Sequence, residues 1–270
     1  MSLVDLVAVV TRQFPSVKGA GFVANSLREL STSVDRPTST RTIDWQNTIW
    51  ELDLREVTEA AVFFFPQLYN RRELDFLRSV TPVGGAFLDV GSNIGFYSVS
   101  MARHVGPTGK CLAIEADPET AAKVRATLKR NALHWISVSE NAVSDAVGVA
   151  RFEIRVDGNR GGSGLVDSGG RAASAASRVV EVPTQPLLTL MQDNGVTAVD
   201  SMKVDLEGHE ERVFETFFST APRSLWPRHL VVEFLAEAGA KRPLHVMLEK
   251  AGYVERGRTA ENLMLSLGGA

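Results

Sequence analysis

The stretch that decides the fold is Phe87-Leu88-Asp89-Val90-Gly91-Ser92-Asn93-Ile94-Gly95. Its apolar first half, which begins at Ala86, is short and stops at a glycine, as is typical of a parallel strand covered on both faces. After Gly95, apolar residues recur at helical spacing, so we expect a helix to begin inside or just after the turn. The stretch therefore predicts a buried strand, a glycine turn and the first turn of a helix.

This glycine turn is expected to hold a ligand. Gly91 and Gly95 let the backbone approach a bound molecule closely, and a helix N-terminus offers unpaired N–H groups and the positive end of a dipole. Asp89 puts a carboxylate at the same crevice, where it would repel a pyrophosphate. A ligand that combines a carboxylate, an ammonium and a sulfonium suits both ends, and S-adenosylmethionine is such a ligand.

Length and composition are those of an ordinary globular protein. The 270 residues suffice for one large α/β domain with extensions or for two small domains. The net charge of -3 does not favour nucleic acid as the main partner, and we expect none. With Cys111 as the single cysteine, no intrachain disulfide is possible, and we expect it to be a small buried residue.

The region before the glycine turn is predicted to mix helices and strands. Met1–Val10 is apolar but has no basic residue before it and is too short to span a bilayer, so we expect a packing segment of a cytoplasmic protein without a transmembrane segment. The pattern further predicts a loop at Ser31–Thr42, a strand or hairpin arm at Trp45–Leu54, a core strand at Ala60–Phe65 and a helix at Asn70–Val80.

From Phe87 onward, strands and helices alternate. The strand Phe87–Val90, the helix Gly95–His104, the strand Lys110–Glu115 and the helix Pro118–Asn131 form one βαβα sequence. This order indicates a parallel sheet with right-handed crossovers, and so an α/β fold. Further strands are expected at Trp135–Val138, Val147–Arg155, Val179–Val182, Ser201–Leu206, Leu230–Phe234 and Tyr253–Glu255, and further helices at Leu187–Asn194, Glu211–Phe218 and Pro243–Ala251.

Acidic side chains follow four of the predicted strands. They are Asp89, Glu115, the pair Asp205 and Glu207, and Glu233. In an open parallel sheet the ligand crevice lies beyond the carboxyl ends of the strands, so these acids are candidate site residues. Glu115 stands 26 residues after Asp89 (115 minus 89), near the offset at which nucleotide-binding folds place an acid on ribose hydroxyls.

Four segments carry a resemblance to a known family. They are residues 87–97, the run Ile114-Glu115-Ala116-Asp117-Pro118, residues 141–145 and residues 202–210, of which Lys203-x-Asp205-x-Glu207-Gly208 is the most distinctive part. In this order they resemble the FkbM family of S-adenosylmethionine-dependent methyltransferases, over roughly residues 70–235. The resemblance implies a class I methyltransferase fold, which is Rossmann-like, with a seven-stranded, mostly parallel sheet whose last strand is antiparallel and with helices on both faces.

The resemblance also implies a cofactor site and a reaction. The reaction is usually O-methylation of a hydroxyl on a sugar, glycolipid or natural product, so the expected partner is a small-molecule or glycosidic acceptor. By position, the methionine part lies at Asp89, Gly91, Asn93 and Gly95, the ribose at Glu115 and the adenine beside Asn141 and Ala142, while Ser92, Ala116 and Asp205 complete the expected cofactor set.

Methyl transfer to a hydroxyl needs a group that takes the proton of the acceptor. The candidate catalytic residues are Asp205, Glu207, His209 and Glu233, and His209 is a plausible general base by its ordinary pKa. A structural role for His209 at the start of a helix is equally compatible with the pattern. Asp205, Glu207 and Glu233 could instead bind Mg²⁺ as an additional cofactor, unless Lys203 or an arginine neutralises these acids.

The chain is expected to divide near residue 80. Residues 1–80 would form an N-terminal extension that contributes to the acceptor site or to oligomer contacts such as those of a homodimer, and residues 81–270 the S-adenosylmethionine-binding domain. The Gly-, Ser- and Ala-rich tract Asp157–Ser177 is expected to be a loop that acts as a lid. Two rival functions stay open, a nicotinamide-dependent oxidoreductase, disfavoured by Asp89 and the missing third glycine, and a non-catalytic binding protein on the same fold.

Overall fold

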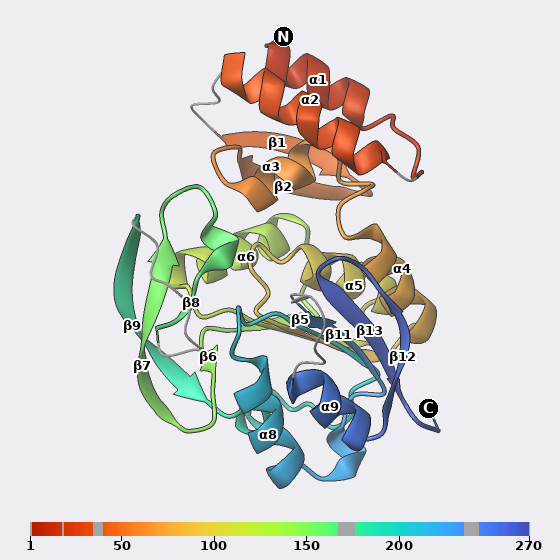
Figure 1. Cartoon of the computed structure of the whole chain (residues 1–270), viewed down its shortest axis with the longest axis vertical. Helices are drawn as coiled ribbons and strands as arrows, with labels where there is room; N and C mark the ends of the chain where they lie inside the picture. Colours follow the sequence, from red (N-terminus) through yellow and green to blue (C-terminus); the bar gives the residue numbers. More distant parts are fainter. Residues whose placement is uncertain (1, 18, 35–39, 167–175, 235–242, 270) are drawn as a thin grey trace. The chain divides into compact units, whose positions relative to one another are not determined.

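The computed structural model describes residues 2–17, 19–34, 40–166, 176–234 and 243–269 (Figure 1). The chain divides into two compact units, one of residues 1–71 with 155–161 and one of residues 72–154 with 162–270. None of the described helices is long and apolar enough to cross a membrane.

The first unit combines three helices with a two-stranded hairpin. Its elements are α1 (Leu3–Thr11), α2 (Ala20–Val34), β1 (Thr40–Trp45), β2 (Thr48–Asp53) and α3 (Val57–Phe64). The strands β1 and β2 pair antiparallel, which confirms the hairpin arm expected at Trp45–Leu54. The loop expected at Ser31–Thr42 is wrong at both ends, because α2 continues to Val34 and β1 begins at Thr40, while residues 35–39 lie outside the described part of the chain.

The predicted core strand Ala60–Phe65 is wrong, because these residues belong to α3 and its C-terminal cap. Side chains all around this helix are buried, so its sequence shows no polar face from which a helical period could be recognised. Buried Glu59 anchors the helix, since its carboxylate accepts the backbone N–H of Asp53 at 2.6 Å.

The second unit is built on a seven-stranded sheet with the order β12-β13-β11-β10-β3-β4-β5. Strands β11, β10, β3, β4 and β5 are mutually parallel, and β13 runs antiparallel to both of its neighbours. This arrangement confirms the mostly parallel α/β fold. The strands are β3 (Ala86–Val90), β4 (Lys110–Ile114), β5 (Ile136–Ser139), β10 (Ser201–Val204), β11 (His229–Glu233), β12 (Tyr253–Arg258) and β13 (Asn262–Leu267).

Helices cover both faces of this sheet. Figure 1 shows α4, α5 and α6 on one side and α8 and α9 on the other. The buried core contains strand residues such as Leu88, Leu112 and Val204 together with Phe214 and Phe217 of α8. Free Cys111 is buried in β4, as expected. The helices are α4 (Arg71–Val80), α5 (Phe96–Val105), α6 (Pro118–Arg130), α7 (Leu187–Asp193), α8 (Glu210–Thr220) and α9 (Pro243–Lys250).

A second, four-stranded sheet has the order β6-β9-β7-β8. Two strands expected from the pattern, Val147–Arg155 and Val179–Val182, belong to this sheet. Of the predicted lid Asp157–Ser177, residues 160–162 form a short 3-10 helix, whereas residues 167–175 lie outside the described residues. The strands are β6 (Ala142–Val143), β7 (Gly148–Arg155), β8 (Gly164–Leu165) and β9 (Ser177–Gln185).

Candidate active site

The four strands that carry the candidate acids are neighbours in the sheet, in the order β11-β10-β3-β4. Because they are parallel, their carboxyl ends lie at one edge, where an open α/β sheet binds its ligands. In this register Val90 lies beside Val204, and Val204 beside Val232. Asp89 and Glu233 lie at the ends of β3 and β11, and Glu115 and Asp205 directly follow β4 and β10, so these acids gather at one edge of the sheet.

The glycine turn after β3 is held by backbone bonds. The N–H groups of Gly91 and Ser92 both donate to the carbonyl of Ile114, at 3.0 and 2.9 Å. A Cβ on Gly91 would lie 1.8 Å from the carbonyl oxygen of Asp205, and its φ of +80° also requires glycine. Gly95 likewise makes room for Val124. The space left by each glycine is thus used by the protein itself, and the expected close approach of a ligand stays a prediction.

Asp89 lies beneath this turn and is 1% exposed. Its Oδ2 accepts the hydroxyl of Ser98 at 2.5 Å, and the backbone N–H of Ser98 donates to the same carboxylate. Burial raises the pKa of Asp89 to about 6, against these hydrogen bonds and the nearby charge of Lys203. A carboxyl group of the protein itself therefore lies at the positive end of α5.

Glu115 joins the glycine turn to the loop after β4. Its two oxygens accept the backbone N–H groups of Asn93, at 2.7 Å, and Asp117, at 2.9 Å. Burial raises the pKa of Glu115 to about 7, while these hydrogen bonds oppose the shift. Asp117 caps α6 by accepting the N–H of Glu119 at 3.1 Å, so a capping aspartate holds the loop of Glu115 in place.

The residues assigned to the adenine side come from three short segments. Ala116 and Ala142 are buried in one apolar cluster, together with Phe152, Ile154, Leu165 and Val182 of the second sheet. The side-chain amide of Asn141 donates to the hydroxyl of Ser139 at 3.1 Å. Ala116, which directly follows Glu115 in the sequence, and Ala142 therefore belong to the same apolar wall.

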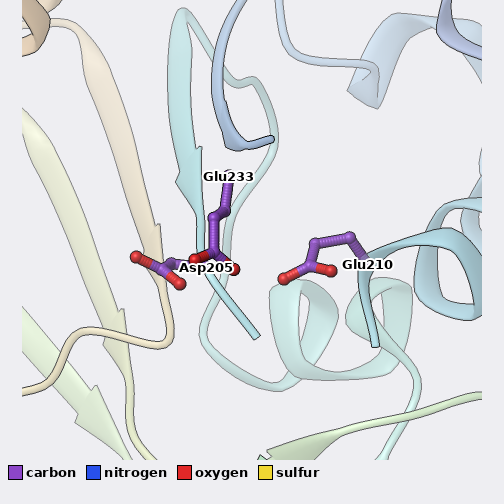
Figure 2. A group of neighbouring side chains, drawn as sticks. All are labelled: Asp205, Glu210 and Glu233. Carbon is purple, nitrogen blue, oxygen red and sulfur yellow. The ribbon is translucent and has the colours of Figure 1, made fainter. Parts of the chain in front are cut away.

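A group of three acids lies beyond β10 and β11 (Figure 2). Asp205, Glu210 and Glu233 each offer a carboxylate oxygen, and these oxygens lie within 4.8 Å of one another. The metal-ligand set expected from the sequence had Glu207 in place of Glu210. Burial, followed by the charges of Asp205, Glu207 and Glu210, raises the pKa of Glu233 to about 9.

Glu210, which the sequence interpretation did not assign, shapes the loop after β10. One oxygen accepts the N–H of Leu206 at 2.6 Å and the other that of Gly208 at 3.2 Å. Burial raises its pKa, and these hydrogen bonds oppose the shift. Its place in the first turn of α8, just after the glycine, is the sequence signal for this role.

His209 is buried and lies apart from the three acids. Its Nε2 is 3.3 Å from the hydroxyl of Ser144, and the neighbouring Asp145 accepts Nε of Arg212 at 3.0 Å. Burial lowers the pKa of His209, and the charge of Arg212 lowers it further while Asp145 opposes the shift. His209 therefore joins α8 to the Asn141–Asp145 segment, and its lowered pKa favours the neutral imidazole.

The residues at this edge fit S-adenosylmethionine. Among the described residues, the buried hydroxyl of Ser92 has no hydrogen-bond partner, so a polar group of a ligand can satisfy it. Glu115 keeps carboxylate lone pairs that can accept ribose hydroxyls. The apolar wall of Ala116 and Ala142 suits a purine.

Comparison with solved structures shows similar folds at low identity. They include the precorrin-6y C5,15-methyltransferase of Geobacter metallireducens GS-15 (14% identity, 72% of this chain and 85% of that chain, TM-score 0.41). M. jannaschii TYW2 in complex with AdoMet has 12% identity over 85% of each chain and a TM-score of 0.44. The methyltransferase FkbM of Methylobacillus flagellatus KT has 12% identity over 77% of this chain and 52% of that chain, with a TM-score of 0.39.

Comparison with sequences is more specific. No curated protein matches the chain at a significant level. A family model described as protein-L-isoaspartate(D-aspartate) O-methyltransferase matches residues 19–152, less than half of the chain. The model of the methyltransferase FkbM domain matches residues 89–254, from the glycine-turn aspartate to β12 and more than half of the chain. The chain therefore belongs to the FkbM family and is an S-adenosylmethionine-dependent methyltransferase.

Proposed function

We propose that this enzyme methylates a hydroxyl group of a sugar, a glycolipid or a related natural product. The observation that carries the proposal is the acid group beyond β10 and β11, with buried Lys203 beside it. Carboxylates hydrogen-bond hydroxyl groups and accept their protons, which suits a polyhydroxylated acceptor. The nicotinamide-linked alternative is disfavoured by the family match over residues 89–254.

Asp205 is the group that we propose to take the proton. Its Oδ2 lies 3.0 Å from the ammonium of Lys203, and we propose that Oδ1 faces the acceptor. When bound, S-adenosylmethionine would supply an electrophilic methyl group and leave as S-adenosylhomocysteine, while the acceptor hydroxyl loses its proton as its oxygen is methylated. Asp205 receives that proton, so the new O–CH₃ bond leaves no charge on the product oxygen.

Glu233 is proposed to orient the acceptor. Burial and the charges of the neighbouring acids raise the pKa of Glu233, which favours a protonated carboxyl group that donates a hydrogen bond. Glu207 is proposed to bind a further hydroxyl, since its charge acts on Glu233 and so belongs to the surroundings of the acid group. A donor and an acceptor side by side can hold one hydroxyl in a single orientation.

His209 is the alternative base. Its neutral imidazole can accept a proton, although its contact in the structure is Ser144 and it lies outside the acid group. We therefore propose that His209 positions the Asn141–Asp145 segment, and that proton transfer belongs to Asp205. The two roles predict different kinetic effects, since a positioning residue changes cofactor affinity and a base changes kcat.

The same contacts bear on the magnesium hypothesis. Oxygen ligands such as those of Asp205, Glu210 and Glu233 suit Mg²⁺. Lys203, however, already compensates Asp205, and two backbone N–H groups already donate to Glu210. We therefore propose that methyl transfer needs no divalent ion at this group, and we expect full activity in EDTA. Loss of activity in EDTA that Mg²⁺ restores would favour a metal instead.

The experiment begins with the acceptor. The purified chain is incubated with S-adenosylmethionine labelled in the methyl group and with a panel of glycosides, glycolipids and phenolic natural products, and labelled products are identified by mass spectrometry. An O-methyl ether is the expected product. Label on carbon or nitrogen would overturn the proposed reaction while leaving the methyltransferase itself intact.

Variants then assign the roles. With the acceptor identified, Asp205→Asn is expected to lower kcat by about 100-fold or more, as loss of a general base does. His209→Gln is expected to weaken S-adenosylhomocysteine binding in calorimetry with a smaller change in kcat. The matched control is Glu181→Gln, an exposed acid on β9 in the second sheet. If Asp205→Asn kept full turnover, the assignment of the base would be wrong.

A further inference from the structure

Helix α2 of the first unit exposes large apolar side chains, which is unusual for a helix that packs only within its own chain. The residues it buries are small, namely Ala20, Ala24 and Ser31. Its large apolar residues Val23, Leu30 and Val34 are 49, 63 and 71% exposed. A surface helix normally turns its large apolar side chains toward the core. The exposed face of α2 is therefore unpartnered within the described chain.

These exposed residues follow the spacing of a helix-pairing seam. Val23, half-buried Leu27, Leu30 and Val34 stand at intervals of four, three and four residues. Apolar residues that alternate at intervals of three and four are the a and d positions of a heptad, whose side chains interlock with those of a second helix. We call these four residues the α2 stripe.

The α2 stripe is symmetric about its own centre. Val23 and Val34 are equally far from the midpoint between Arg28 and Glu29, and so are Leu27 and Leu30. Two antiparallel copies of α2 related by a two-fold axis at that midpoint would place each Val23 against Val34 of the other copy, and each Leu27 against Leu30. Such self-complementarity is what an isologous dimer interface requires.

Charge also favours a second copy over a lipid surface. The stripe is bordered on its exposed side by Ser26 and Ser33, and Arg28 and Glu29 pair with one another away from it. Helices that bind anionic membranes carry Lys and Arg along the border of the apolar face. An uncharged stripe with serine borders instead matches an identical uncharged stripe.

The first unit exposes further large apolar side chains outside the α2 stripe. Helix α1, which packs beside α2 (Figure 1), exposes Leu3, Leu6, Val9 and Val10 to between 40 and 50%, and Phe22 at the start of α2 is also exposed. These side chains add to the apolar surface that the first unit exposes, and a standard interface takes roughly 800 Å² from each partner.

We propose that the α2 stripe is the two-fold, antiparallel dimer interface between two copies of this chain. The interface is set by the first unit alone, so it does not depend on the acceptor of the methyl group.

The first test measures the oligomeric state of the full chain. Light scattering after size exclusion, over about 1–100 μM protein, is expected to give the mass of a dimer. Val23→Glu and Leu30→Glu should each give a monomer, because two charges would be buried against apolar side chains. The matched control is Gly21→Glu, an exposed position on the other side of α2 with open space around it. A monomeric wild type, or a dimer that persists in both stripe variants with unchanged circular dichroism, would overturn the proposal.

The second test measures the direction of the pairing. In the antiparallel arrangement, two copies of residue 30 lie about 4–5 Å apart along the helix axis, and two copies of residue 23 about 16 Å apart. A short bismaleimide should therefore cross-link Leu30→Cys efficiently and Val23→Cys at least tenfold less. Cys111 is buried and gives the background in the wild-type chain. Equal cross-linking of both variants would indicate parallel helices, and flotation of monomeric wild type with neutral lipid vesicles would identify a membrane surface; either result overturns the proposal.

Discussion

The ammonium of Lys203 lies 3.0 Å from Oδ2 of Asp205, and its side chain is 3% exposed. The same ammonium is 5.7 Å from the centre of the Tyr97 ring in α5. Its charge also opposes the effect of burial on the pKa of Asp89 and of Glu233. The charge of buried Lys203 therefore acts both on Asp89, beneath the glycine turn, and on the acids Asp205 and Glu233 at the ends of β10 and β11.

Replacement of Lys203 by Met keeps the length of the side chain and removes this charge. Without the cation, ionisation of Asp89 and Glu233 becomes less favourable, because the charge of Lys203 lowers the pKa of both groups. We expect kcat to fall by about 100-fold and the acidic limb of the pH–rate profile to move up by about 1–3 pH units.

The conservative variant Lys203→Arg is the control for this effect. It retains the charge, so the acidic limb should stay near its wild-type position even if the larger head group lowers kcat. A Lys203→Met profile with the wild-type midpoint would show that the cation does not set the ionisation of the site.

A second prediction concerns Gly91. A methyl group there would overlap the carbonyl of Asp205, so Gly91→Ala should displace the loop after β10. Gly84 has the same φ of +80°, but a Cβ at that position would meet only the hydroxyl of Thr108 at 3.4 Å. Gly84→Ala therefore reproduces the backbone strain, about 1–2 kcal/mol, without the overlap.

Calorimetry with S-adenosylhomocysteine separates the two variants. Gly91→Ala is expected to bind at least about 100-fold more weakly than Gly84→Ala, whose affinity should be that of the wild type. Equal affinities would mean that the contact between the glycine turn and the Asp205 loop is not needed for the cofactor site.

Much of this site could be predicted from the sequence, because its signals are local. The Phe87–Gly95 stretch encodes the strand and turn by an apolar run that stops at a glycine, and Asp117 with Pro118 encodes the start of α6. The side-chain partners of these residues could not be predicted. Ser98 reaches Asp89, and Ser144 reaches His209, only after the chain has folded.

The errors in the fold have the same physical origin. Ala60–Phe65 is apolar on every side because α3 is buried all around, which erases the period that distinguishes a helix from a strand. The strands of the second sheet have ordinary strand sequences, and no local signal indicates that β7 and β9 lie side by side in a separate sheet instead of joining the large one. The strand β13 is almost entirely buried and so shows no alternation either.

A third prediction concerns the bond between Ser98 and Asp89. Ser98→Ala removes a hydrogen bond to a buried carboxylate and should reduce the free energy of unfolding by about 1–3 kcal/mol. A hydrogen bond to an ionised carboxylate is stronger than one to a neutral carboxyl group, so this bond matters most where Asp89 is ionised. The folded-state pKa of Asp89 is about 6, above its ordinary value of 3.8, so Asp89 ionises between pH 5 and pH 7.5. The loss should therefore be larger at pH 7.5 than at pH 5 in urea denaturation. Ser100→Ala, on the same helix but partly exposed, should change stability by less than about 0.5 kcal/mol at both pH values.

The last prediction concerns the pH dependence of cofactor binding through Glu115. Its pKa is raised to about 7 by burial, above the ordinary value of 4.5. In the free protein this shift contributes stability that is full below about pH 4.5 and is lost as the pH rises through 7, because the folded state holds the proton more tightly. Ribose hydroxyls donate to the ionised carboxylate, so binding should favour loss of that proton.

The dissociation constant for S-adenosylhomocysteine should therefore be about tenfold higher at pH 6 than at pH 8, as a single linked proton with a pKa of 7 requires. Glu115→Gln keeps the shape of the side chain and removes the titrating group, so it should bind more weakly at pH 8 and show no such pH dependence. The exposed Glu181→Gln variant should retain the wild-type ratio. If Glu115→Gln still showed the tenfold change, another group at the site would be losing the proton and Glu115 would not be the ligand of the ribose.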